Sequence, residues 1–118
     1  MKPQNLKDRT KLFAISVLKY LSKIPTHGPY YSINNQLSRA SMSVGANYRA
    51  VSRAKSPADF INKLKIVEEE CDESMYFLEI LIELLPEDKL KLDILHKEAN
   101  ELLSIVVASI KTARKNNS

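Results

Sequence analysis

The sequence has two glycines, two histidines and one cysteine in 118 residues. Two glycines are too few for the glycine-rich loop that cradles phosphates in nucleotide-binding enzymes. The single Cys71 excludes a disulfide within the chain and is typical of a reducing compartment. Two distant histidines, His27 and His96, exclude a histidine-rich metal site. We therefore expect a protein that is not an enzyme and that needs no metal or cofactor.

Long apolar runs are also absent. No uncharged stretch approaches the ~20 residues of a transmembrane helix, and Glu79 and Glu83 interrupt the longest candidate. The first residues lack the apolar run of a signal peptide. We expect a cytoplasmic protein with no membrane partner. At 13.4 kDa, residues 1–118 are expected to form a single domain with one core.

Three breaks divide the chain. Residues 24–29 contain two prolines and one glycine, which is a strong loop signal. Ser56 followed by Pro57 is typical of a helix start, with serine as the N-cap and proline at the first helical position. Pro86 gives a similar signal. The breaks predict helices at about residues 6–24, 32–54, 58–85 and 87–114.

Apolar spacing supports a helix in every segment. In the third, apolar or small residues recur at alternating intervals of four and three, which no strand produces. They are Phe60, Leu64, Val67, Cys71, Ser74, Leu78, Leu81 and Leu85. Four helices with short connections predict an all-α, antiparallel up-down-up-down four-helix bundle.

The third helix has further apolar residues outside this seam. They include Met75, Phe77, Ile80 and Leu84. A helix that is apolar around most of its circumference is buried on more than one side. We therefore expect these four residues to lie between copies of the chain in a homo-oligomer.

A polar face follows the seam of the second helix. Gln36, Arg39, Ser43 and Asn47 are spaced three, four and four residues apart, so they share one side of the helix. One interpretation is a structural network that fixes the register of the helices. The other is a contact surface for a ligand or partner. Small residues nearby suit close helix packing and favour the structural interpretation.

Arg39 gives a more specific expectation. In an antiparallel hairpin that turns near Lys55, Arg39 lies opposite residue ~72 of the third helix. We expect a partly buried pair between Arg39 and a carboxylate at that level. The candidates are Glu69, Asp72 and Glu73.

The acidic run 68–73 raises the possibility of a carboxylate metal site. Such sites in helix bundles need Glu-x-x-His pairs, and no histidine follows a glutamate by three residues. Cys71 lies on the apolar seam, so we interpret it as a buried small hydrophobe.

The topology also gathers positive charge. In this bundle, the starts of the first and third helices share an end with the finishes of the second and fourth. That end collects twelve cationic residues against Asp8 and Asp59. The cations are Lys2, Lys7, Arg9, Lys11, Arg49, Arg53, Lys55, Lys63, Lys65, Lys111, Arg114 and Lys115. Such an excess attracts phosphate backbones.

We therefore expect this end to bind nucleic acid, with little base recognition because Tyr48 is the one obvious stacking residue nearby. The expected binding residues are Arg49, Arg53, Lys55, Lys63, Lys65, Lys111, Arg114 and Lys115.

Two stretches carry a family resemblance. Gln36-Leu37-x-Arg39-Ala40-x-x-Ser43-Val44-x-Ala46-Asn47 and Glu73-Ser74-x-x-x-Leu78-Glu79 resemble bacterial four-helix-bundle proteins encoded within 23S rRNA intervening sequences. Relatives include the accessory variability protein of diversity-generating retroelements. The resemblance implies a homopentamer that binds RNA or a nucleic-acid enzyme, without catalysis.

The resemblance carries over Arg39, Ser43, Asn47 and Glu79, and Glu73 joins this polar set as a carboxylate partner of Arg39. Two departures stand out. Asn47 is followed by Tyr48-Arg49-Ala50-Val51, where the family usually has Ile-Ala-Glu-Gly, and Phe77 stands where many relatives have glutamate.

The sequence thus favours a non-enzymatic oligomeric adapter for structured RNA or for a nucleic-acid-handling protein. The alternative is a protein-interaction scaffold without affinity for nucleic acid.

Overall fold

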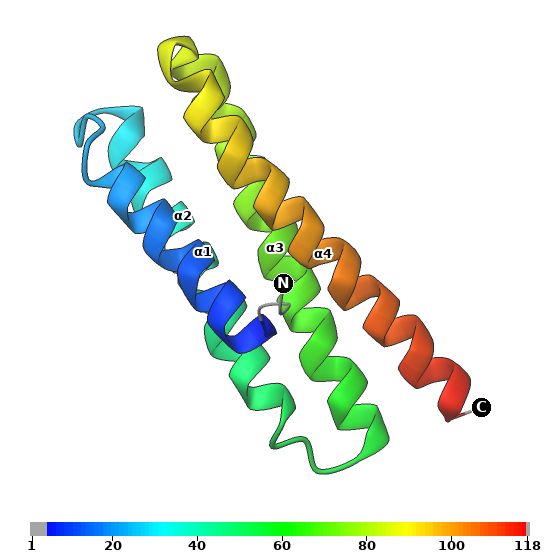
Figure 1. Ribbon diagram of the computed structural model, residues 1–118. Helices are drawn as coiled ribbons and strands as arrows, with labels where there is room; N and C mark the ends of the chain where they lie inside the picture. Colours follow the sequence, from blue (N-terminus) through cyan, green and yellow to red (C-terminus); the bar gives the residue numbers. More distant parts are fainter. Residues whose placement is uncertain (1–4, 118) are drawn as a thin grey trace.

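The computed structural model describes residues 5–117 and confirms the predicted all-α four-helix bundle (Figure 1). Each helix runs antiparallel to the one before it. A single 3₁₀ turn, η1 (Pro86–Asp88), precedes the last helix. The helices are α1 (Leu6–Leu21), α2 (Pro29–Val51), α3 (Pro57–Leu84) and α4 (Lys89–Asn116).

Local signals set most helix ends. Ser56 caps α3, since its hydroxyl accepts a hydrogen bond from Asp59 N at 3.0 Å. The first helix ends three residues earlier than predicted, because Pro25 disfavours helical backbone at Ile24. The second begins three residues earlier than predicted. Gly28 adopts φ 60 there, a conformation open to glycine, and Pro29 then takes the first helical position.

One apolar core fills the centre of the bundle. The predicted seam of α3 is inside, with Leu64, Val67 and Leu78 at most 2% exposed. Leu37 of α2 and Leu92 of α4 are fully buried against it. The spacing of four and three residues therefore predicted the buried face of the third helix, because it keeps side chains on one stripe of a 3.6-residue helix.

The helices differ in length, and this difference shapes one end. The first has 16 residues, whereas α3 and α4 have 28 each. At 1.5 Å per residue, α1 is about 18 Å shorter than α4. In Figure 1 the last turns of α4 extend past the start of α1. The bundle has four helices along most of its length and three at this end.

The off-seam residues of α3 are mostly covered within the chain. Met75, Phe77 and Ile80 are half-buried and pack against the core, while Leu84 is 40% exposed. Apolar side chains with a larger exposed fraction lie on another helix. Leu90 and Ile94 on α4 are 82% and 70% exposed. The apolar surface open to a partner therefore extends beyond the four residues expected from the sequence.

Among the described residues, no helix has the length and apolar character to cross a lipid bilayer.

Candidate nucleic-acid interface

Cationic side chains gather where α2 ends, α3 begins and α4 ends. Residues 49–65 and 105–117 contain eight of them and a single carboxylate, Asp59. We call these eight residues the basic end. They are Arg49, Arg53, Lys55, Lys63, Lys65, Lys111, Arg114 and Lys115.

The carboxylate of Asp59 is already engaged. Lys63 Nζ lies 3.1 Å from each carboxylate oxygen, and the backbone N–H of Lys55 donates to Oδ2 at 3.0 Å. The hydrogen bond from Lys55, followed by that from Lys63, lowers the pKa of Asp59. Asp59 therefore compensates Lys63 and is held at the start of α3.

Most of the remaining cations point into solvent. The side chains of six are exposed, and within residues 5–117 no carboxylate lies within 4.0 Å of their side-chain nitrogens. The six are Arg49, Arg53, Lys55, Lys65, Lys111 and Arg114. Their charge is available to an external anion.

Arg9 does not add to this charge, contrary to the expectation from the sequence. Its Nε and Nη2 donate to Glu98 of α4 at 2.8 Å and 2.7 Å, and Nη2 also contacts Glu101. The hydrogen bonds to Glu98 raise the pKa of Arg9. The expectation was wrong because it placed the start of the first helix level with the finish of the fourth, whereas α1 starts beside the middle of α4. Lys2, counted with the same group, lies outside the described residues.

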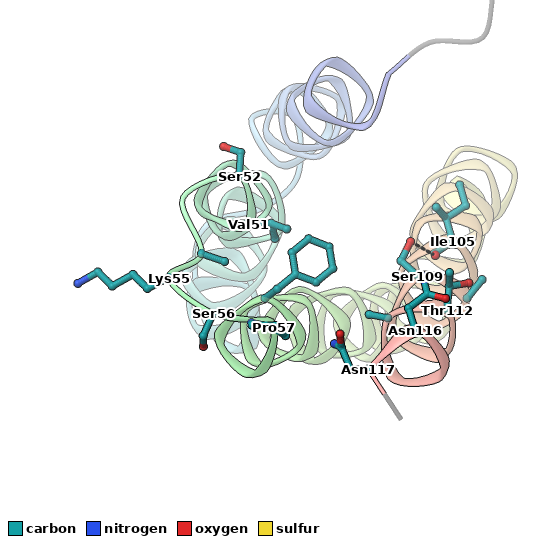
Figure 2. Close-up of a pocket in the computed structure, with 14 residues that line it drawn as sticks. Val51, Ser52, Lys55, Ser56, Pro57, Ile105, Ser109, Thr112, Asn116 and Asn117 are labelled. Carbon is teal, nitrogen blue, oxygen red and sulfur yellow. Dashed lines mark hydrogen bonds between the residues drawn. The ribbon is translucent and has the colours of Figure 1, made fainter.

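An open groove of about 1000 Å³ lies between the two halves of the basic end (Figure 2). It occupies the space beside α4 that α1 leaves uncovered. Figure 2 shows Val51 pointing into the groove, whereas Lys55 extends away from it into solvent. One wall is Val51, Ser52, Ala54, Lys55, Ser56, Pro57 and Phe60; the other is Ile105, Ala108, Ser109, Thr112, Ala113, Asn116 and Asn117.

Sequence reasoning missed this groove, because no motif marks it. The available signal was the unequal length of the predicted helices, about residues 6–24 against 87–114. In an antiparallel bundle, that inequality leaves part of the longer helix without a neighbour.

The polar face of the second helix contacts α3 through Arg39. Arg39 binds Glu73, one of the three expected carboxylates, and its second partner is Glu70 at 3.2 Å. The Arg39 side chain is 47% exposed, whereas those of Glu70 and Glu73 are 16% and 35% exposed, so the carboxylates are partly buried and the guanidinium is at the surface. Because Arg39 lies on α2 and both carboxylates lie on α3, these ion pairs connect the two helices.

In the part of the chain that the structure describes, no hydrogen bond joins Arg39 to the other members of the predicted network on α2 or to Glu79. Asn47 Nδ2 donates to the backbone oxygen of Ser43 at 2.8 Å, within α2. Glu79 Oε2 lies 2.8 Å from His96 Nε2 of α4. Gln36 is exposed. The structure does not bring these side chains together as one network.

Cys71 is fully buried, and burial raises the pKa of its thiol to about 12. A thiol in that environment stays protonated and is a poor nucleophile. In residues 5–117, no group of three or more His, Cys, Asp or Glu side chains could hold a metal ion.

Comparisons with known proteins agree with the fold. The model of the family described as 23S rRNA-intervening sequence protein matches residues 4–108. A crystal structure of a protein of unknown function from the S23 ribosomal protein family of Bacteroides thetaiotaomicron is similar to this chain, with 30% identity and a TM-score of 0.80. The match covers 91% of this chain and 99% of that one. No curated protein matches the sequence.

Proposed function

Because the chain belongs to the family of 23S rRNA-intervening sequence proteins, we propose that it is a non-enzymatic, cytoplasmic adapter that binds structured RNA through the basic end. The observation that carries the proposal is the gathering of eight cations and one engaged carboxylate by α2, α3 and α4. Cations held at one end by rigid helices create a local positive potential that attracts a polyanion.

The proposed binding is directed at the phosphate backbone. Arginine and lysine contacts to phosphates release counterions, so the affinity falls steeply as the salt concentration rises. Such contacts position the RNA without reading its sequence. We therefore expect salt-dependent binding with weak sequence preference at the basic end.

The proposed adapter is also a homo-oligomer, with five copies as the family resemblance implies. Exposed Leu84, Leu90 and Ile94 supply apolar surface that a second copy would cover. Several basic ends in one ring would add their fields. Light scattering at micromolar concentration should give a mass several times 13.4 kDa; a monomer would contradict this part of the proposal.

Charge reversal tests the RNA site. Replacing Arg49, Arg53 and Lys55 together by glutamate should abolish retention of RNA at low salt and leave the oligomer intact. The matched control replaces Lys19, Lys23 and Lys91 by glutamate, which makes the same change in net charge at the opposite end. The control should retain RNA. Equal retention by both variants would contradict the proposed site.

The second candidate is a protein-interaction scaffold without affinity for nucleic acid. The observation that favours it is the exposed apolar side chains of Leu12, Leu90 and Ile94, at 50%, 82% and 70% exposure. Apolar side chains exposed together are typical of surfaces that bind other proteins. A wild-type protein that retains no RNA at low salt would support this candidate.

A further inference from the structure

We propose that the groove between the α2–α3 connection and the end of α4 binds unpaired nucleotides of the RNA, so that the protein prefers RNA with single-stranded segments over a blunt duplex. This inference rests on the proposed function, since it assigns a second part of the same site. The basic end would hold phosphates, and the groove would hold bases.

The shape of the groove selects for unpaired bases. Its volume of about 1000 Å³ lies at the upper end of the range for small-ligand pockets, which accommodates about one or two bases. The bases of an A-form duplex are stacked inside it, and side chains cannot reach them through its narrow major groove. A duplex can therefore contact the cations of the basic end, while an unpaired base can also enter the groove.

The lining suits the two chemical features of a base. Val51, Phe60 and Ile105 give apolar surface, against which the flat face of a base can pack, and Phe60 is half-buried with part of its ring accessible. Aromatic side chains stack on any base and so need no particular sequence. Phe60 thus adds a stacking residue that the sequence pattern, which singled out Tyr48, did not place here.

Uncharged polar groups on α4 can meet the edges of a base. Thr112 and Asn116 are exposed along the groove, and an asparagine amide both donates and accepts hydrogen bonds. The Ser109 hydroxyl donates to Ile105 O at 3.0 Å (Figure 2), which leaves its oxygen able to accept. Donors and acceptors on one wall, opposite apolar surface on the other, fit a nucleobase better than an aliphatic chain.

Charge separates this groove from another on the same molecule. Lys55 is the one charged residue that lines it. The smaller groove between α1 and α4, of about 410 Å³, is lined by Glu98 and Glu101 as well as Lys97. Carboxylates repel a phosphate backbone, so the α1–α4 groove is unsuited to RNA. The groove at the basic end can admit a base while phosphates of the same strand contact cations of the basic end.

The test compares two RNA probes: a short blunt duplex, and the same duplex extended by a few unpaired uridines at one 3′ end. Wild-type protein should bind the extended duplex about tenfold more tightly, as expected for stacking of one base. Replacing Ala108 by leucine should fill part of the groove without offering an aromatic face, and should remove this preference while affinity for the blunt duplex is retained. Ala108 is exposed, so the variant should fold.

The matched control is Ala46→Leu, at an exposed position of α2 outside the groove. It should keep the full preference for the extended duplex. As a second readout, 2-aminopurine placed in the overhang should lose fluorescence on binding wild-type protein, through stacking, and should not do so with Ala108→Leu.

Equal affinity of wild-type protein for the two probes would overturn the inference and leave the proposed function standing. A preference that survives in Ala108→Leu would also overturn it. Failure of wild-type protein to bind either probe at low salt would overturn the proposed function, and the inference with it. The variant with Arg49, Arg53 and Lys55 replaced by glutamate should lose affinity for both probes. The groove variant should lose only the preference for the extended probe, so the two variants separate the role of the basic end from that of the groove.

Discussion

Arg9 at the start of α1 binds Glu98 in the middle of α4 through two parallel hydrogen bonds, of 2.8 Å and 2.7 Å. Among the described residues, this cluster, which also includes Glu101, contains the only ion pairs between α1 and α4. It shows where the shorter helix meets the longer one. Residues 105–117 lie beyond that point and supply one wall of the groove.

Replacing Arg9 by alanine should lower the free energy of unfolding by about 1 kcal/mol. The Arg9 and Glu98 side chains are 23% and 30% exposed, so the pair is partly shielded from water. A shielded, charge-assisted hydrogen bond contributes more to stability than a fully exposed ion pair does. Arg9→Lys should recover less than half, because lysine cannot form two parallel bonds. Urea denaturation measures both. Lys7→Ala, on an exposed neighbour, is the control; an equal effect there would contradict the assignment.

Removing Arg39 should have a smaller effect. Its side chain is 47% exposed in the pair with Glu70 and Glu73, and exposed pairs are worth about 0.2–1 kcal/mol because water and salt screen them. We expect Arg39→Ala to lower stability by about 0.5 kcal/mol, and by less at high salt. A loss above about 2 kcal/mol, as for a buried pair, would show that the side chain is shielded in the assembled protein.

Gly45 allows α1 and α2 to approach closely. A Cβ at this position would lie 3.2 Å from Thr10 Oγ1 and 3.5 Å from the Thr10 carbonyl carbon. Thr10 is buried and its hydroxyl is bonded to Leu6 O at 2.7 Å, so it has little room to move. Gly45→Val should therefore destabilise the protein by about 2 kcal/mol in thermal or urea unfolding.

The control for this variant is Ala46→Val, at an exposed position of the same helix. It should change stability by less than about 0.5 kcal/mol. If both valine variants are equally stable, then the helices can separate at Gly45 without cost and the close approach has no energetic role.

Stability should fall at alkaline pH because two buried groups hold their protons more tightly when the chain is folded. Burial raises the pKa of Cys71 to about 12. For Tyr20, burial and then the hydrogen bond to Asp88 at 2.9 Å raise the pKa. The unfolded chain releases these protons near their ordinary pKa values of about 8.5 and 10. Rising pH above those values therefore favours unfolding.

Urea denaturation between pH 8 and pH 11 measures this slope. Each group contributes at most about 1.4 kcal/mol per pH unit above its ordinary pKa. Cys71→Ala should remove the fall in the free energy of unfolding that begins near pH 8.5, whatever its effect on stability at neutral pH. Tyr20→Phe should remove the further fall that begins near pH 10. A Cys71→Ala curve parallel to the wild type over the whole range would refute the assignment.

Periodicity along the chain was enough to predict the fold. Apolar residues such as Leu64, Val67 and Leu78 repeat at intervals that keep them on one side of a helix, and all three are inside the bundle. Ser56 and Pro57 marked the start of α3 for an equally local reason, since a cap depends only on its own neighbouring N–H groups. Expectations of this kind use contacts within one helix or between consecutive helices.

Only the tertiary structure decided how far each helix is displaced along its neighbours. Spacing in the sequence gives the direction of a side chain around the helix axis but not its height relative to another helix, which depends on packing along the whole interface. For this reason the sequence placed Arg9 at the basic end, whereas the structure pairs it with Glu98. The same displacement leaves the end of α4 without α1 beside it and opens the groove beside Phe60.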